Sequence, residues 1–452
     1  MNALLVICGL GVFSLLAEVF NLKKWTTIIS VSGLIVAFAF VILDWRSISY
    51  YYHGMVFFDH FSLAFSGLIL LVSIFWFWMS RAYFTGDEHR TDKSALILFV
   101  IVGAILMVSF NNMAILFLGI EILSISLYVL AGSNKQSLFS SESAFKYFLM
   151  GSFATGFLLF GMTLVYGATG SFNIPAIAAF VQAHSTMPRF LLIGMLLMMA
   201  GLAFKISAVP FHQWAPDVYE GAPTPITALM STVVKIAAFT AFVKIFSVAF
   251  ATIKTLVLFE QALMVLTLVV ANVTAVYQTN VKRMLAYSSV GQVGYLLLAF
   301  SSDAANSKGV IFYYLTGYAV ASIMAFTVVQ LIENKKGSAN IENFKGLFKA
   351  SPLLGIAMTV SMFSLAGIPP LAGFFGKYLV FTLSINKGFI ALTTLAVITS
   401  LIGVYYYFKP VIAMTQSAES EIEVSSTEKV LLLILIFVNL VIGVFPDLIR
   451  LI

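Results

Sequence analysis

Long apolar runs constrain this chain more than any other feature of its sequence. A helix needs about 20 apolar residues to cross a bilayer, and hydrophobic residues make up 61% of the 452 residues, against 10% charged ones. Fourteen stretches fit: 3–20, 25–43, 61–79, 94–110, 113–132, 145–168, 190–210, 226–248, 256–277, 281–301, 309–332, 354–382, 388–410 and 430–449. In lipid only helices and closed barrels satisfy the backbone. The runs therefore predict an all-α polytopic membrane protein with about 14 transmembrane helices.

The lysines and arginines between these runs predict the orientation, because cytoplasmic loops carry an excess of both. Of the 25 lysines and arginines, 15 lie in odd-numbered connections. Seven are assigned to even-numbered connections or the C-terminus: Arg46, Arg189, Lys244, Lys254, Lys308, Lys387 and Arg450. We therefore expect both termini on the outer side of the membrane. The net charge of +6 then reflects topology and not a nucleic-acid-binding surface.

The stretch 201–239 places two lysines, Lys205 and Lys235, inside the predicted membrane. A lysine at mid-span costs about 2.5–3.5 kcal/mol, and Lys235 lies about 15 Å from the end of its run, too deep to snorkel. Pro210 and His212 lie between the two lysines. Proline lacks the N–H that a continuous helix needs, so the seventh helix is predicted to break there and resume. Buried charges beside a broken helix indicate an ion pathway more often than a purely structural role.

The fifth run carries a carboxylate deep within it. Glu121 lies about 12 Å from the start of the run, and Ser124 and Tyr128 follow at i+3 and i+7, so the three form one polar stripe. Glu121 either takes part in ion transfer or anchors helix packing. Glu142 and Lys146, at the entrance of the sixth run, form an i,i+4 pair that is either an ordinary interfacial pair or an entrance for ions.

The second half of the chain resembles the first. In the tenth run, Ser288 and Gln292 form a similar stripe without the carboxylate, and the twelfth run has its own predicted break at Pro369 before Lys377. Lys377 lies closer to the outer end, so it either snorkels or joins the pathway. Two five-helix units, helices 4–8 and 9–13, would form an inverted repeat, because an odd number of spans flips each copy.

This reading divides the chain into four segments. They are an N-terminal three-helix segment (1–93), a first five-helix repeat (94–250), a second five-helix repeat (251–412), and a cytoplasmic loop with the last span (413–452).

The sequence offers no site for a redox cofactor. Cys8 is the one cysteine, which excludes an iron–sulfur cluster, a disulfide framework and a c-type haem attachment within the chain. No motif for NADH, flavin or quinone is present, and the histidines lack the spacing of metal ligands. We therefore expect neither cofactor nor metal in this chain.

Four segments carry a resemblance to a known family: FLGIEILSISLYVLAG, the 201–239 stretch, LAYSSVGQVGYLLLAF and SLAGIPPLAGFFGK. They resemble the antiporter-like subunits of respiratory complex I, the type I NADH–quinone oxidoreductase, over essentially the whole chain. Within that family the chain is most similar to the subunit N group. This similarity is carried by the segment VYEGAPTP and by the eleventh run, with Tyr314 and Tyr318.

The resemblance implies a proton-translocating membrane-arm subunit coupled to quinone reduction elsewhere in the complex. The matching relay residues are Glu121, Lys205, Lys235 and Lys377. Supporting residues would be Lys146, Tyr128, Pro210, His212, Ser288, Gln292, Tyr314 and Pro369. Gln292 stands where relatives can carry other polar residues.

The same resemblance implies partners and a location. NADH, FMN, iron–sulfur clusters and quinone would be bound by partner subunits, with the small subunit K and the antiporter-like subunit M as neighbours. The chain would lie in the bacterial plasma (inner) membrane with both termini periplasmic. No interaction with nucleic acid is implied.

Two alternatives stay open at this stage. A subunit of a multi-subunit cation/proton antiporter would share the lysines and the glutamate, although the VYEGAPTP wording and Tyr314 argue against it. A scaffold that only packs against neighbours would not need three buried lysines.

Overall fold

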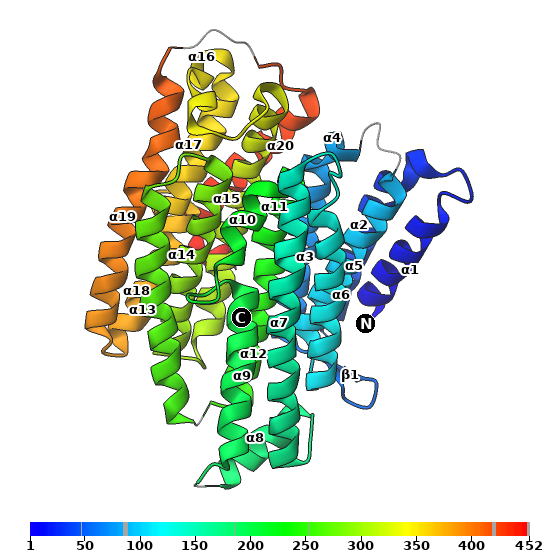
Figure 1. Ribbon diagram of the computed structural model, residues 1–452, viewed down its shortest axis with the longest axis vertical. Helices are drawn as coiled ribbons and strands as arrows, with labels where there is room; N and C mark the ends of the chain where they lie inside the picture. Colours follow the sequence, from blue (N-terminus) through cyan, green and yellow to red (C-terminus); the bar gives the residue numbers. More distant parts are fainter. Residues whose placement is uncertain (47, 85–88, 185, 252, 418–421, 450–452) are drawn as a thin grey trace. The chain divides into compact units, whose positions relative to one another are not determined.

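The computed structural model describes residues 1–46, 48–84, 89–184, 186–251, 253–417 and 422–449 (Figure 1). Almost all of the regular structure is helical. Within these residues, 12 helices are long and apolar enough to cross a membrane. The chain is therefore an all-α polytopic membrane protein, as predicted.

The predicted spans outnumber these 12 helices for a simple reason. Helix α1 (Asn2–Leu16) has 15 residues. The predicted twelfth span corresponds to two helices of 15 residues each, α17 (Pro352–Ala366) and α18 (Ala372–Asn386). A 15-residue helix is about 22 Å long, which is shorter than the hydrocarbon layer of about 30 Å.

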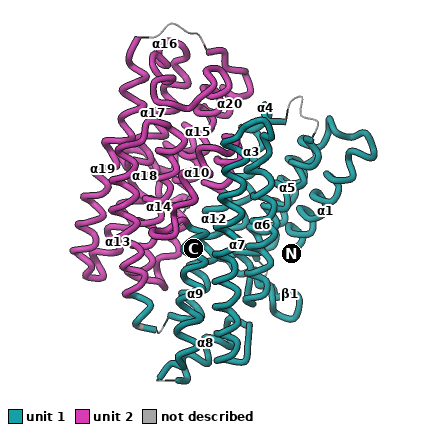
Figure 2. The backbone as a smooth tube through the Cα atoms, in the orientation of Figure 1, with its two compact units in different colours: residues 1–206, 233–257, 452 teal, residues 207–232, 258–451 magenta. Residues whose placement is uncertain are grey.

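The chain divides into two compact units (Figure 2), of which the first comprises residues 1–206 and 233–257. Its remaining elements are η1 Lys23–Trp25, α2 Thr26–Asp44, β1 Ser49–Tyr51, β2 Val56–Phe58, α3 His60–Met79, α4 Arg81–Phe84, α5 Arg90–Ser109, α6 Met113–Ala131, α7 Leu138–Thr169, α8 Ile174–Ala183, α9 Arg189–Ile206 and α12 Lys235–Val248. Strands β1 and β2 form a small antiparallel hairpin in which Tyr50 faces Phe57.

Glycines let the helices of unit 1 approach closely. A Cβ atom on Gly103 of α5 would lie 2.6 Å from the carbonyl oxygen of Gly119 in α6, and one on Gly161 of α7 would lie 2.6 Å from that of Gly194 in α9. Such contacts between small residues are typical of helix packing in membranes. They fix α6 and α9, which carry Glu121 and Lys205. Helix α12 packs against α3, α5 and α9.

The second unit comprises residues 207–232 and 258–451. Besides α17 and α18, its elements are α10 Trp214–Gly221, α11 Thr224–Leu229, α14 Val281–Ser302, α15 Ser307–Lys336, η3 Ile341–Phe344, α16 Leu347–Ala350, α19 Ile390–Thr415, α20 Ser426–Val444 and η4 Pro446–Ile449. Two elements cross the division of the chain: η2 Met230–Val234, a π-helical turn, and α13 Lys254–Val276.

Helix α15 lies at the centre of unit 2, where it packs against α11, α14, α17, α18 and α20. Buried polar groups on it find partners: the hydroxyl of Tyr313 donates to the carbonyl of Ile442, 2.8 Å away. Helix α14 packs against α10, α18 and α19. These contacts hold together the residues of the second half of the candidate site.

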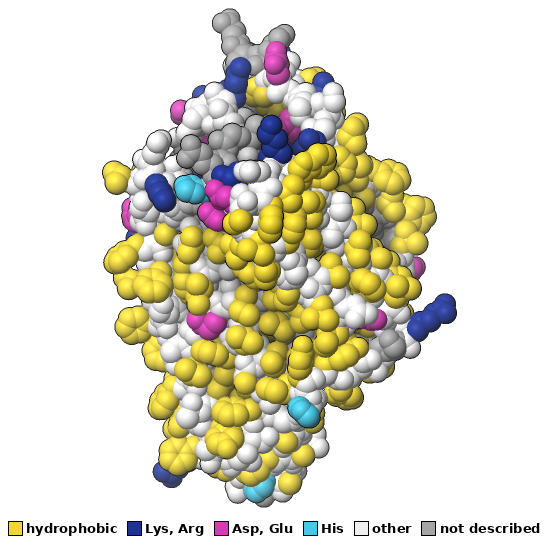
Figure 3. Space-filling model, turned by 90° about the vertical axis from the view of Figure 1, so that its right-hand side faces the viewer, with side chains coloured by type: hydrophobic (Ala, Val, Ile, Leu, Met, Phe, Trp, Pro, Cys, Tyr) yellow, Lys and Arg dark blue, Asp and Glu magenta, His cyan; other side chains and the backbone are white. Residues whose placement is uncertain are grey.

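Apolar side chains are exposed on the outer surface of the helices. On the face drawn in Figure 3, hydrophobic side chains form a broad band and most Lys and Arg side chains gather toward one end. In α2, for example, Ile28 is 57% exposed and Ile42 58% exposed. Exposed apolar side chains on this scale are expected of helices that face lipid.

Candidate functional site

The polar stripe of α6 lies beside the first buried lysine. Lys205, in the last turn of α9, is 5% exposed, and its Nζ donates to Oγ of Ser124, 2.7 Å away. The same Nζ lies 6.0 Å from the centre of the Tyr128 ring. Lys205 therefore binds the predicted polar stripe of α6 at Ser124, which lies one helical turn from Glu121.

Glu121 itself makes no ion pair in the described part of the chain. Its Oε1 is buried and has no hydrogen-bond partner among the described residues. Burial of a carboxylate oxygen without a hydrogen-bond partner in an apolar setting raises the free energy of the folded state. The structure thus places Glu121 and Lys205 on α6 and α9, which the hydrogen bond from Lys205 to Ser124 joins.

The second lysine, Lys235, binds the end of a helix. It opens α12, is 2% exposed, and its Nζ donates to the carbonyl of Ile206, 2.9 Å away. Ile206 is the last residue of α9. The last carbonyls of a helix have no partner within it and carry the negative end of its dipole, so they attract a cation.

Lys377 repeats this arrangement in unit 2. It lies in α18 and is 5% exposed. Its Nζ donates to the carbonyl of Ala366, 2.9 Å away, and Ala366 is the last residue of α17. A second hydrogen bond runs to Oγ of Ser400, at 2.8 Å, and the ring centre of Tyr295 lies 4.7 Å away. The snorkelling alternative is therefore wrong: the described contacts of its ammonium group are internal.

Gln292 connects the other predicted residues of unit 2. Its Oε1 accepts from the hydroxyl of Tyr314, and its Nε2 donates to the hydroxyl of Tyr407, 2.9 Å away, and to the carbonyl of Leu365, at 3.2 Å. Tyr407 also bonds to Ser288.

Gln292, Tyr314 and Leu365 line a cavity of about 10 Å³, together with Lys377. A space of this size is about the smallest that holds a water molecule. The lysine, the glutamine and the tyrosine thus face one small polar space.

The remaining predicted residues lie in three other places. Lys146 pairs with Glu142 at 2.6 Å on α7. Pro210 and His212 lie between α9 and α10, and Nδ1 of His212 is buried without a hydrogen-bond partner among the described residues. Pro369 lies between α17 and α18 and is exposed.

Two other cations of unit 2 have acidic partners. Nζ of Lys282 lies 3.1 Å from Glu333, and Nη1 of Arg283 lies 2.7 Å from Asp217 and 2.9 Å from Glu220. These charges are neutralised in place, because each side chain faces a carboxylate. Lys205, Lys235 and Lys377 instead donate to neutral oxygens in every described hydrogen bond.

Lys244 does not lie where the sequence predicted. Lys244 was assigned to an outer connection, but it lies within α12, is 7% exposed, and donates to Oγ of Ser62 and to the carbonyl of Val108, both 3.0 Å away. Its position four residues from the end of the helix suggested exposure. Contacts with α3 and α5 cover it, and hydropathy cannot detect such contacts.

Glu260 was missed altogether. It is 3% exposed in α13, and its Oε1 has no hydrogen-bond partner among the described residues. Leu268 of α13 lies against Gly294 of α14, so in this antiparallel pair Glu260 is level with the last turn of α14. There Oγ of Ser301 also has no described partner. The sequence signal was available, because Glu260 is the one carboxylate of the ninth run.

No group of three or more His, Cys, Asp or Glu side chains that could hold a metal occurs among the described residues. The polar groups of the site are amines, carboxylates, hydroxyls and an amide. These groups can bind and pass protons, and they have no redox chemistry of their own under ordinary conditions.

Comparison with known proteins identifies the family. A family model described as NADH:quinone oxidoreductase/Mrp antiporter, TM, matches residues 110–403. Subunit N of the NADH-quinone oxidoreductase of Cytophaga hutchinsonii is 46% identical over 452 residues, which cover 99% of this chain and 98% of the relative.

Solved structures also resemble this chain. A chain of respiratory complex I from Thermus thermophilus is 31% identical with a TM-score of 0.85, over 99% of this chain and 98% of that one. A chain of the Mrp complex from Dietzia sp. DQ12-45-1b has a TM-score of 0.89 over 99% of this chain and 95% of that one, but its 20% identity shows a shared fold alone. The chain therefore belongs to the subunit N family of NADH–quinone oxidoreductase, the antiporter-like, proton-translocating subunits of the membrane arm of complex I, as the sequence predicted.

Proposed function

We propose that Glu121, Lys205, Lys235 and Lys377 are the residues that carry protons through this subunit. The observation that supports this proposal most strongly is that the three lysines are buried and donate only to neutral oxygens in their described hydrogen bonds. A lysine in an apolar medium holds its proton less tightly than one in water. A neutral partner leaves that proton free to move, whereas a permanent carboxylate partner would hold it.

Glu121 is the group that changes this balance. It lies one turn from Ser124, the acceptor of Lys205, and its Oε1 has no partner among the described residues. A carboxylate strengthens the hold of a nearby amine on its proton. Approach of Glu121 would load Lys205 with a proton, and withdrawal would release it toward Lys235.

The two interrupted helices are part of the proposed pathway. Segments 207–213 and 367–371, which contain Pro210 and Pro369, separate α9 from α10 and α17 from α18. Backbone groups released by such breaks hold water or ions inside a membrane. We further propose that they belong to inverted five-helix repeats at 94–250 and 251–412, flanked by segments 1–93 and 413–452. The matching bonds from Lys235 and Lys377 to helix ends support this division.

The setting of the subunit follows from its family and its charges. The proposed location is the bacterial inner membrane with both termini periplasmic, supported by the excess of lysine and arginine in odd-numbered connections. Small subunit K and antiporter-like subunit M are the proposed neighbours. NADH, FMN, iron–sulfur clusters and quinone would be bound in partner subunits, which supply the free energy of quinone reduction.

Replacement of Lys235 tests the proposal. In the assembled complex, Lys235→Ala should abolish most proton pumping driven by NADH, because the relay loses its central proton carrier. Lys235→Arg should do the same, since arginine keeps its charge but does not release a proton.

Lys93→Gln provides the control, because Lys93 lies outside the relay, over the ring of Tyr83. It should pump normally. A Lys235→Arg complex that pumps at the native rate would show that the position supplies charge alone, and the relay would have to avoid it.

A further inference from the structure

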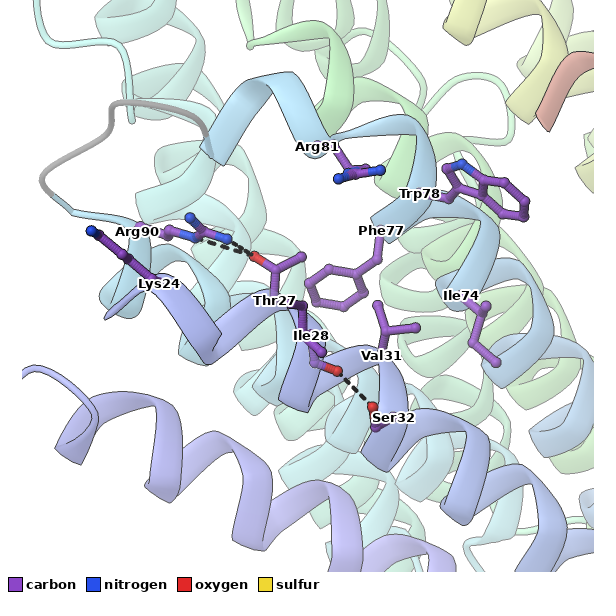
Figure 4. Close-up of a pocket in the computed structure, with 10 residues that line it drawn as sticks. All are labelled: Lys24, Thr27, Ile28, Val31, Ser32, Ile74, Phe77, Trp78, Arg81 and Arg90. Atoms are coloured by element: carbon purple, nitrogen blue, oxygen red, sulfur yellow. Dashed lines mark hydrogen bonds between the residues drawn. The ribbon is translucent and has the colours of Figure 1, made fainter. Parts of the chain in front are cut away.

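A cavity of about 580 Å³ lies in unit 1, among α2, α3 and the start of α5, and includes no residue of the proposed relay (Figure 4). Its charged lining consists of Lys24, Arg81 and Arg90. Lys24 precedes α2, Arg81 follows α3 and Arg90 begins α5. Because successive spans run in opposite directions, these three ends face the same surface of the membrane.

Arg90 is held in the cavity by an uncharged partner. Its Nε and Nη2 donate to Oγ1 of Thr27, at 3.2 and 2.7 Å, as Figure 4 shows. Two acids near it make other contacts: Asp92, two residues along the chain, lies 3.7 Å from His89, and Glu18 accepts from Thr91 at 3.0 Å. The guanidinium therefore keeps N–H groups, and its charge, for a further acceptor.

The rest of the lining is mostly apolar and follows the helices away from the charged end. Ile28 and Val31 of α2 form one wall, and Ile74 and Phe77 of α3 form the other (Figure 4). Ile74 is about 10 Å along the helix from Arg81. Ile28 is 57% exposed, so the wall formed by α2 is open at the surface of the chain.

We propose that this cavity binds one anionic glycerophospholipid, with its phosphate against Lys24, Arg81 and Arg90 and an acyl chain between the walls of α2 and α3. Arginine matches phosphate geometry with paired N–H groups, and basic pockets between membrane helices suit anionic headgroups. A free phosphate ion would make no use of the apolar walls. A zwitterionic lipid would bring its own cation toward three others.

Lipid retention by the purified complex measures this binding. The native complex is stripped of lipid in detergent, incubated with phosphatidylglycerol or phosphatidylethanolamine, and weighed intact by mass spectrometry. Arg81→Gln/Arg90→Gln should retain about one phosphatidylglycerol molecule fewer than native, the number that a cavity of this size accommodates. Retention of phosphatidylethanolamine should not change. Lys93→Gln, one turn from Arg90 and outside the cavity, should retain as much phosphatidylglycerol as native.

A second variant keeps every charge and fills the cavity. Ile74→Trp should lose the same lipid, because the larger ring occupies the place of the acyl chain. Inorganic phosphate should not displace the bound lipid at concentrations that leave other anionic lipids in place. The proposal is overturned if Arg81→Gln/Arg90→Gln keeps its phosphatidylglycerol, if Lys93→Gln loses it equally, or if Ile74→Trp retains it. Displacement by phosphate would indicate a site for a free anion.

Discussion

Lys205, Lys235 and Lys377 show what the sequence could and could not predict about single residues. Their depth in apolar runs predicted burial, and each is 5% exposed or less. The acceptors were not predictable, because a helix-end carbonyl such as that of Ile206 becomes available only where the fold ends the helix. Glu121 and Ser124 were predicted on one polar stripe, and it is Ser124 that accepts the hydrogen bond of Lys205.

The predicted coupling of Glu121 and Lys205 can be measured with a double-mutant cycle. Glu121→Gln and Lys205→Ala should each slow NADH-driven proton pumping at least about tenfold, which corresponds to 1.4 kcal/mol. The double variant should be little worse than either single one, because loss of one partner already disables the pair. The measurement is the initial pumping rate of the reconstituted complex. Losses that multiply would show that the two residues act independently.

Glu260 provides a second expectation for a single residue. Glu260→Gln keeps the shape of the side chain and removes its ability to exchange a proton. We expect slower pumping in an assembled complex, and weaker carbodiimide labelling of this subunit than in the native complex, because carbodiimides modify protonated carboxyls in apolar surroundings. Glu428→Gln is the control, since Glu428 is half-buried and belongs to the capping box at the start of α20. Normal pumping by Glu260→Gln would leave Glu260 a structural role only.

At the scale of helices, the sequence predicted the elements better than their ends. Apolar runs located the spans because each helix must cover its backbone in lipid. The end of α17 depends on a single position: Gly367 has φ +86°, and a Cβ there would lie 2.9 Å from Cδ of Lys377. The prolines indicated a break nearby, but not that glycine leaves room for the lysine.

Gly388 provides a matched control for substitution of Gly367. Gly388 has φ +84° and open space around its Cα, so alanine at either position costs about 1–2 kcal/mol of backbone strain. Gly367→Ala should also displace Lys377 and reduce pumping severalfold, whereas Gly388→Ala should alter thermal stability alone. The comparison uses melting temperature and pumping rate in the same preparations. Equal pumping by both variants would separate Gly367 from the function of Lys377.

At the scale of the whole molecule, the sequence predicted the class and the family, and the comparisons confirmed both. The sequence did not predict that the helices group into two compact units. Residues 207–232 belong to one unit and 233–257 to the other, although they are consecutive in the chain. Such a division depends on which helices pack together, and apolar periodicity in a bilayer carries little information on partners.

Orientation can be tested with cysteines, because Cys8 is the one cysteine of the chain. In a Cys8→Ser background, Gln136→Cys lies in an odd-numbered connection and Ala305→Cys in an even-numbered one, and both positions are exposed. A membrane-impermeant maleimide added to intact cells should label position 305 and not 136. Inverted vesicles should give the opposite result. Labelling of position 136 in intact cells would reverse the proposed topology.

The bonds from Lys235 and Lys377 to the last carbonyls of α9 and α17 have a mechanical consequence. A charged amine binds a carbonyl more strongly than a neutral one does, so each lysine fastens a helix end while it holds its proton. When the proton leaves, that fastening weakens and the adjoining segment, 207–213 or 367–371, gains freedom to shift. In the proposed relay, proton occupancy would thereby be converted into backbone position, and a displacement of the chain would pass to a neighbouring protein even where no charge crosses between them.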